Sequence, residues 1–248
     1  MSIESLIEPR WKHPPTVRAV TTTRQGGCSQ PPFASFNLAT HVGDDPDQVA
    51  HNRAQLRHLA QLPTAPLWLN QTHSCTVATV GADHPDCTAD ASIARAPGQV
   101  CAVLTADCLP ILLCETNGRA IAAIHAGWRG LAGGIVEQTV AQLGHPPLNL
   151  SAWLGPAIGP TAFEVGAEVR EIFCDCDSHA TVAFQPTRPG HWLANLPLLA
   201  QQRLTRLRVR HIASSGLCTV TDPARFFSYR RDGRTGRMAT VIWLISGD

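Results

Sequence analysis

Long apolar runs are missing from this chain of 248 residues, and no stretch approaches the length that a membrane-spanning helix needs. The segment Met1–Arg10 carries Glu4 and Glu8, so we expect no signal peptide there. The formal net charge is only +1, which excludes a bulk electrostatic attraction to nucleic acid or to a membrane surface. We therefore expect a cytoplasmic protein with no nucleic-acid or membrane partner, and we expect it to be a monomer.

Lysine and methionine are nearly absent as well. Lys12 is the only lysine among 20 basic residues, and Met1 and Met238 are the only methionines. Arginine suits planar recognition of phosphate or carboxylate, although genomic base composition explains most of this excess. Blue-copper sites usually include a weak axial methionine, so its scarcity argues against redox copper. The nine cysteines are expected to be reduced thiols, and Cys174 and Cys176 lack the second pair of a zinc finger.

Two apolar runs that end in polar clusters form the centre of the sequence, in Thr105–Leu113 and Ile121–Gly130. Short apolar runs bounded by turn residues are typical of buried strands. The Asn-Gly pair within Glu115–Gly118 predicts a hairpin turn between them. Cys108 and His125 are therefore expected at the ends of two neighbouring strands.

Strand and helix patterns share the rest of the chain, which predicts an α+β fold. Asp45 as N-cap and Pro46 at the first helical position predict a helix that ends near Leu62, with Val49, Leu56 and Leu59 on its apolar face. The other expected helices are Leu131–Leu143, Glu164–Cys174 and Asn195–Arg208, and the other expected strands are Val17–Thr23, Pro66–Leu69, Thr76–Val80, Leu150–Leu154, Val209–Ala213 and Met238–Ile245. Because no repeat or linker interrupts the chain, we expect residues 1–248 to form a single-domain sandwich of mixed sheets flanked by helices.

His73, Cys108 and His125 all fall in polar clusters at the ends of predicted strands. Two imidazoles and one thiolate suit zinc, and three protein ligands leave a fourth position for water. The soft sulfur ligand is also compatible with copper. The same residues could form a metal-free nucleophile and base, or they could be ordinary core and packing residues. The spacing alone leaves these alternatives open.

Five strings, in order along the chain, resemble the bacterial YfiH-like family. They are Asn70–Ser74 (NQTHS), Thr105–Leu113 (TADCLPILL), His125–Gly130 (HAGWRG), Gly155–Gly166 (GPAIGPTAFEVG) and Phe227–Ala239 (FSYRRDGRTGRMA). The segments Thr22–Ser29 and Ser35–Asp45 also match. Members of this family are known as laccase-domain or polyphenol oxidoreductase proteins, as purine nucleoside phosphorylases and as peptidoglycan editing factors.

The resemblance implies an α+β sandwich similar to that of cysteine hydrolases. It also implies that the family's metal-binding and catalytic trio falls on His73, Cys108 and His125, with zinc as the metal. The implied activities are phosphorolysis of adenosine, inosine, guanosine and methylthioadenosine, with phosphate as co-substrate, and deamination of adenosine. Many relatives have cysteines and a tyrosine where Thr161–Phe163 stands here. Since the trio is intact, that departure concerns contacts in the pocket wall.

Phosphorolysis requires phosphate held against the sugar and stabilisation of negative charge on the departing base. A helix N-terminus expected at Gly127–Gly130 could bind an anion. The candidate substrate-binding residues are Arg24, Asn37, Gln71, Arg129, Tyr229, Arg230 and Arg231. The arginines of the last loop could instead form a solvated surface. Deamination also needs a proton shuttle, for which Asp107 or a histidine is a candidate.

Three rival functions use the same residues. A copper polyphenol oxidase needs histidines in paired clusters, and no His-x-His pair occurs among the 11 histidines. A metal-free hydrolase that edits peptidoglycan precursors would use Cys108 as nucleophile and His125 or His73 as base. A non-enzymatic metal or nucleotide binder is the third. The leading expectation is a zinc-dependent purine nucleoside phosphorylase with adenosine deaminase activity, with the oxidase and hydrolase classes as alternatives.

Overall fold

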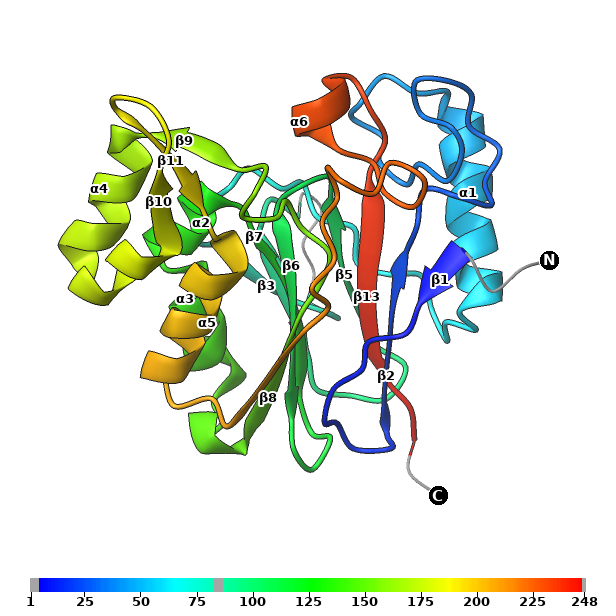
Figure 1. Cartoon of the computed structure of the whole chain (residues 1–248). Helices are drawn as coiled ribbons and strands as arrows, with labels where there is room; N and C mark the ends of the chain where they lie inside the picture. Colours follow the sequence, from blue (N-terminus) through cyan, green and yellow to red (C-terminus); the bar gives the residue numbers. More distant parts are fainter. Residues whose placement is uncertain (1–4, 83–86, 247–248) are drawn as a thin grey trace.

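Two β-sheets packed face to face organise the computed structural model, which describes residues 5–82 and 87–246 (Figure 1). In order across the sheet, the six-stranded sheet consists of β12 (His211–Ser214), β8 (Leu150–Leu154), β6 (Leu109–Glu115), β7 (Ile121–Ala126), β4 (Ala91–Ala94) and β3 (Val77–Thr79). The four-stranded sheet consists of β1 (Leu6–Ile7), β2 (Val17–Thr22), β13 (Met238–Leu244) and β5 (Val100–Thr105). A small third sheet consists of β10 (Phe184–Pro186), β11 (His191–Ala194) and β9 (Glu164–Gly166).

Helices cover the outer faces of both large sheets, which gives four layers (Figure 1). The outer face of the six-stranded sheet carries α3 (Ile135–Leu143) and α5 (Leu196–Arg206), and the outer face of the four-stranded sheet carries α1 (Pro46–Leu59). The remaining helices are α2 (Trp128–Gly133), α4 (Ala167–Cys176), α6 (Tyr229–Asp232), and the 3-10 helices η2 (Pro147–Asn149) and η3 (Ser178–Ala183).

The central strands are buried on both faces, which explains their nearly continuous apolar sequences. Side chains alternate along β6: Leu112 packs in the core between the two sheets, whereas Ile111 and Leu113 pack in the core beneath the helices. This double burial fixes the register of β6 against β7, because a slip of one residue would exchange the two faces.

Most predicted elements are confirmed. The helices predicted from Asp45 and over Asn195–Arg208 are present, Asp45 caps its helix as expected, and the mixed α+β sandwich is confirmed. The strands Val17–Thr23, Thr76–Val80, Leu150–Leu154, Val209–Ala213 and Met238–Ile245 correspond to β2, β3, β8, β12 and β13 within two residues at each end.

Four local predictions are wrong. The single helix over Leu131–Leu143 is two helices, because Gly134 has φ of +98° and ends α2. The start of the helix predicted at Glu164 is a strand, because Glu164–Gly166 pairs with β11. Leu59 is 38% exposed and does not share the buried face of Val49 and Leu56. The strand predicted over Pro66–Leu69 reduces to one isolated bridge at Leu67.

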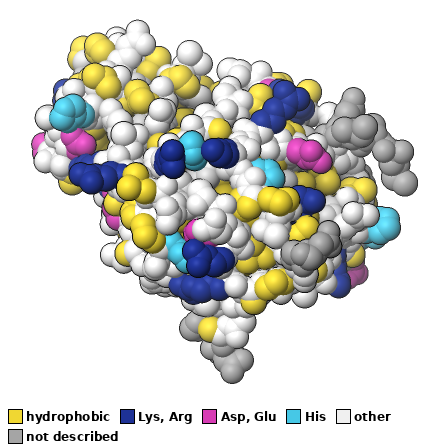
Figure 2. Space-filling view, turned by 90° about the horizontal axis from the view of Figure 1, so that it is seen from below, with side chains coloured by type: hydrophobic (Ala, Val, Ile, Leu, Met, Phe, Trp, Pro, Cys, Tyr) yellow, Lys and Arg dark blue, Asp and Glu magenta, His cyan; other side chains and the backbone are white. Residues whose placement is uncertain are grey.

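Among the described residues, no helix combines the length and the apolar character needed to cross a bilayer. Of the segment Met1–Arg10, where no signal peptide is expected, residues 1–4 lie outside the described part. On the face seen in Figure 2, Lys and Arg side chains occur in several separate groups, interspersed with acidic and apolar ones. This mixed surface agrees with the small net charge of the sequence.

Candidate functional site

Cys108 and His125 lie close together at the open end of the hairpin formed by β6 and β7, as predicted. Cys108 immediately precedes β6, and His125 is the penultimate residue of β7. The two strands are antiparallel, with Leu109 opposite Ala126 and Pro110 opposite His125. The Asn-Gly turn predicted at Glu115–Gly118 closes the other end of this hairpin.

His73 comes from a loop that one buried carboxylate organises. Its backbone has φ of +63°, which is uncommon for a residue other than glycine. The Asp90 carboxylate accepts the backbone N–H groups of Thr72 (3.2 Å), His73 (2.9 Å) and Ser74 (2.6 Å), and also the Ser74 hydroxyl (2.8 Å). These contacts hold the loop Thr72–Ser74 against the end of the six-stranded sheet, where Asp90 precedes β4.

The three side chains converge at one point. One ligand atom from each of His73, Cys108 and His125 lies within 4.8 Å of the other two. Cys108 Sγ is 3.6 Å from His73 Nε2, and the two imidazole centroids are 4.9 Å apart. His125 is buried, Cys108 is half-buried and His73 is exposed, so the group is open to solvent on one side.

The separation of one pair of these atoms matches the geometry of a zinc site. Bonds of about 2.0–2.3 Å in a tetrahedral arrangement place zinc ligands about 3.3–3.6 Å apart, and the separation of Cys108 and His73 already matches. Within the described residues this is the one group of three or more His, Cys, Asp or Glu side chains close enough to share an ion. The set has three protein ligands, as in zinc sites that keep an open position.

Charge complementarity stabilises the thiolate. Burial alone would raise the pKa of the Cys108 thiol, but the charge and hydrogen bonds of His125 and His73 outweigh it and hold the pKa at about 6. Burial opposes the charge on His125, yet Cys108 and Asp90 raise its pKa to about 9. Asp90 is also desolvated, and its bonds to His125 and Ser74 lower its pKa to about 2. At neutral pH, these opposite shifts favour a Cys108 thiolate beside a His125 imidazolium in the metal-free protein.

Asp107, a candidate proton shuttle, connects three segments of the chain beside Cys108. Its carboxylate accepts the Thr219 hydroxyl (2.5 Å) and the Arg230 backbone N–H (2.6 Å), and its carbonyl accepts the Ile158 N–H (2.9 Å). Its φ of +93° is again unusual for a residue with a side chain. Both carboxylate oxygens are thus engaged in holding neighbouring segments around the trio.

Two predicted substrate-binding amides are engaged with the backbone. Gln71 pairs with Leu104 at the end of β5, donating to its carbonyl and accepting from its N–H, both at 2.8 Å. Asn37 is fully buried, accepts the N–H groups of Ala39 and Arg237, and donates to the Ala39 carbonyl and to a neighbouring carboxylate. In this structure both amides shape the loops around the trio.

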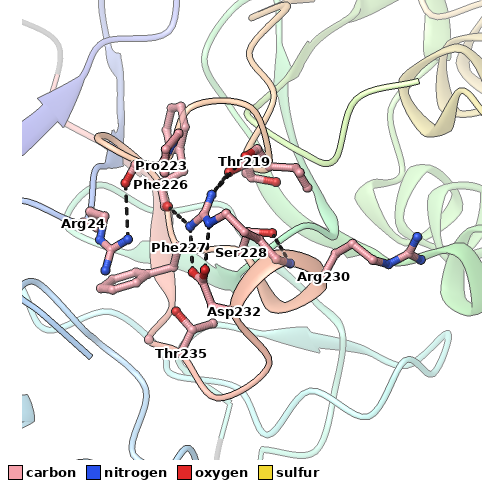
Figure 3. Close-up of polar contacts among 12 residues, drawn as sticks. Arg24, Thr219, Pro223, Phe226, Phe227, Ser228, Arg230, Asp232 and Thr235 are labelled. Carbon is pink, nitrogen blue, oxygen red and sulfur yellow. Dashed lines mark hydrogen bonds and ion pairs between the residues drawn. The ribbon is translucent and has the colours of Figure 1, made fainter. Parts of the chain in front are cut away.

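The arginines predicted to bind substrate also have protein partners. Arg24 donates to the Pro223 carbonyl (Figure 3). It also donates to the Ala34 carbonyl. Arg231 donates to the carbonyls of Thr219, Val220 and Phe226 and to the Asp232 carboxylate, and Figure 3 shows Thr219, Phe226 and Asp232 gathered around this point. Arg230 points away from that cluster and donates to the carbonyls of Ala162 and Glu164.

Tyr229, the first residue of α6, is 62% exposed. Ser228 caps this short helix by accepting the Arg231 N–H. Arg129 is exposed and stacks on the ring of Trp128, 4.3 Å from its centroid. The structure thus places Tyr229 and Arg129 at the surface.

Sequence reasoning missed two residues near the trio. Asp90 lies in a segment without a clear pattern, and only the folded chain brings it under His73 and His125. Arg237 is half-buried: burial lowers the pKa of its guanidinium, and attraction to Cys108, Asp107 and Tyr229 opposes that shift. Its Nη1 donates to the carbonyls of Thr235 and Gly236. The sequence does not distinguish Arg237 from the other arginines of the last loop.

A groove of about 710 Å³ lies beside the C-terminal half of α1. It is lined by Arg53, Ala54, Arg57, His58, Gln61, Leu62, Ala65, Pro66 and Trp68. None of these lining residues is among the predicted site residues, so we assign the chemistry to the trio and not to this groove.

Comparisons with known proteins identify the family of the chain. A family model described as "Multi-copper polyphenol oxidoreductase laccase" matches residues 18–245. A protein of Shigella flexneri and one of Escherichia coli (strain K12), both named "Purine nucleoside phosphorylase YfiH", are 50% and 49% identical over 98% of this chain and all of theirs. A crystal structure of a Neisseria meningitidis protein is 44% identical and superposes with a TM-score of 0.93, covering 98% of this chain and all of that one.

Proposed function

Because the chain belongs to the family described as multi-copper polyphenol oxidoreductase laccases, whose full-length relatives are named purine nucleoside phosphorylases, we propose that it cleaves purine nucleosides by phosphorolysis. The observation that supports this proposal best is the convergence of His73, Cys108 and His125 within 4.8 Å. We assign the metal-binding and catalytic roles to these three residues. Adenosine, inosine, guanosine and methylthioadenosine are the proposed substrates, with phosphate as the attacking group.

Zinc is the proposed metal, held by His73, Cys108 and His125. When bound, zinc would supply a Lewis acid with an open coordination position. The thioether of Met238 does not favour redox copper, because it is engaged elsewhere. Met238 is buried among Ala106, Phe226 and Phe227, and its sulfur accepts the Phe227 N–H at 3.1 Å. The described residues contain a single group of three possible metal ligands, which is fewer than a site with several copper ions needs.

Phosphorolysis breaks the N-glycosidic bond, joins a phosphate oxygen to C1′ of the sugar and leaves the electron pair and a proton on the base. The chain must therefore hold a multiply charged anion near the trio. Arg237 is the arginine whose charge reaches Cys108 and Asp107, and we propose that it contacts phosphate. Tyr229 is exposed on its short helix and interacts electrostatically with Arg237. We propose that its ring packs against the purine base.

Product analysis with adenosine tests this proposal. With phosphate present, we expect adenine and a sugar phosphate. Without phosphate, inosine would reveal the proposed deamination. Arsenate should replace phosphate in base release. Cys108→Ala should abolish turnover, whereas base release that ignores the anion, or full activity of Cys108→Ala, would contradict the proposal.

A Cys–His hydrolase is a second candidate, favoured by one specific observation. Without a metal, Cys108 is a thiolate 3.6 Å from an imidazole nitrogen of His73, beside the charged His125. Such a pair could cleave misplaced residues from peptidoglycan precursors. This candidate predicts activity in the presence of a strong chelator and a covalent acyl adduct on Cys108 by mass spectrometry, neither of which zinc-dependent phosphorolysis gives.

A further inference from the structure

One buried side chain contacts the segments of both imidazole ligands. Asp90 is fully buried, and its Oδ1 accepts the His125 Nδ1–H at 2.8 Å together with the His73 backbone N–H at 2.9 Å. Its Oδ2 accepts the N–H groups of Thr72 and Ser74 and the Ser74 hydroxyl. The two ligands are 52 positions apart in the chain, and Asp90 accepts hydrogen bonds from both of them.

From these contacts we infer that Asp90 is the positioning residue of the proposed metal site, and that it sets the orientation of His73 and His125 together. By accepting the proton on Nδ1, it leaves Nε2 of His125 as the nitrogen that faces Cys108 and His73. By accepting three consecutive N–H groups, it holds His73 in a left-handed backbone conformation that residues with side chains seldom adopt. The inference rests on the proposed metal site.

Both oxygens of the Asp90 carboxylate accept several hydrogen bonds, so an uncharged side chain of the same shape cannot replace it. Five donors meet two carboxylate oxygens, which together offer about four lone-pair sites. An asparagine has the same shape but only one acceptor oxygen, and its NH₂ group would face either two or three of these donors. The backbone of Asp90 has bonds of its own, to the Thr76 carbonyl and from the His125 N–H, and they do not depend on the side chain.

Asp90→Asn should therefore weaken the site while the sheet stays folded. In a chelator competition, zinc is expected to bind Asp90→Asn about 10- to 100-fold more weakly than the wild type. The matched control is Ser74→Ala, which removes one donor to Asp90 and leaves the carboxylate and all three backbone bonds; its zinc affinity should change by less than about fivefold. Both variants are measured at a temperature at which near-ultraviolet circular dichroism shows a native fold.

A second readout needs no metal. In the metal-free protein, the amide protons of Thr72, His73 and Ser74 donate to Asp90, so their hydrogen exchange should be at least about tenfold faster in Asp90→Asn. The amides of the hairpin β6–β7 should exchange as in the wild type. A third readout uses the zinc-loaded protein: nuclear magnetic resonance should show a slowly exchanging His125 Nδ1 proton in the wild type, which the variant loses.

The outcomes separate the two proposals. If Asp90→Asn binds zinc as tightly as the wild type and keeps slow exchange at residues 72–74, the positioning role is wrong while the phosphorolysis proposal stands. If the wild type binds zinc no better than a His73→Ala variant, the proposed metal site fails, and the positioning role fails with it. A lower melting temperature of Asp90→Asn with unchanged zinc affinity would reduce Asp90 to a structural residue.

Discussion

Gly127 lies directly against the ring of His73. A Cβ atom at this position would be 2.7 Å from His73 Cδ2, closer than Cβ atoms approach other atoms in proteins, and 3.0 Å from Cys108 Sγ, which is an unusually tight contact. Gly127 follows β7 and caps α2 with φ of −65°, a conformation open to any residue. The glycine is therefore required by the space that the two ligands occupy, not by its backbone angles.

Gly127→Ala is expected to weaken zinc binding at least about tenfold, because the added methyl group pushes the His73 ring away from Cys108. The fold should survive, since His73 is exposed and its ring can move outward. Titration of the metal-free variant with zinc in the presence of a competing chelator measures the effect. An affinity equal to that of the wild type would show that His73 is not held at the position where the structure places it.

Cys108→Ala and His125→Ala should both abolish nucleoside turnover but differ in stability. Cys108 is half-buried, so its truncation should cost less than about 1 kcal/mol of the free energy of unfolding. His125 is buried and bonded to Asp90, and its loss leaves a buried carboxylate with one partner fewer, which should cost about 1–3 kcal/mol. Urea unfolding of the metal-free proteins measures both values. Equal losses would contradict the proposed importance of the His125–Asp90 bond.

The sequence predicts the hairpin well because its signals are local. The apolar runs on both sides of Glu115–Gly118 and the Asn-Gly turn are enough to place Cys108 and His125 at neighbouring strand ends. Glu164–Gly166 shows the limit of such signals. Its pattern continues into a helix, but pairing with β11, far along the chain, makes it a strand. Likewise, only a known φ of +98° at Gly134 distinguishes two short helices from one.

Polar residues are harder to interpret from sequence, because their partners are distant. The sequence predicts that Gln71 and Asn37 bind substrate, and it gives no sign of the hydrogen bonds that their amides make to Leu104, Ala39 and Arg237 in the structure. Asp90 shows the opposite case. It has no local pattern, and it acquires its contacts only when the loop of His73 and the end of β7 meet above it.

Alkylation of Cys108 in the metal-free protein should depend on pH with a midpoint near 6. The thiolate is the reactive form, and a lowered pKa means that it is present above pH 6 and lost as the pH falls through that value. An unperturbed thiol would become reactive only near its usual pKa of 9.0. Iodoacetamide labelling followed by peptide mass spectrometry gives the rate at each pH. Cys101, whose burial raises its pKa to about 12, should stay unlabelled in the native protein and serves as the internal control.

In the same labelling experiment, His125→Gln should move the midpoint for Cys108 to higher pH, because the imidazolium is the strongest influence lowering this pKa. Zinc should protect Cys108 in the wild type by occupying its sulfur. A midpoint near 9 in the wild type would show that the two histidines do not lower the pKa of the Cys108 thiol.

Arg237→Gln tests the proposed contact with phosphate. Arg237 is half-buried, and its charge reaches Cys108 and Asp107, so removing that charge should raise the KM for phosphate by about tenfold or more. Arg234→Gln is the matched control from the same loop, because Arg234 is exposed and donates to the Gly43 carbonyl. Its KM for phosphate should stay within about twofold of the wild type, since exposed charges contribute little. Deamination of adenosine uses no phosphate, so Arg237→Gln should change its rate less than that of phosphorolysis. Initial rates at varied phosphate, with the nucleoside saturating, separate KM from kcat. If the two variants raise the KM for phosphate equally, the anion is held by the general charge of the loop and not by Arg237.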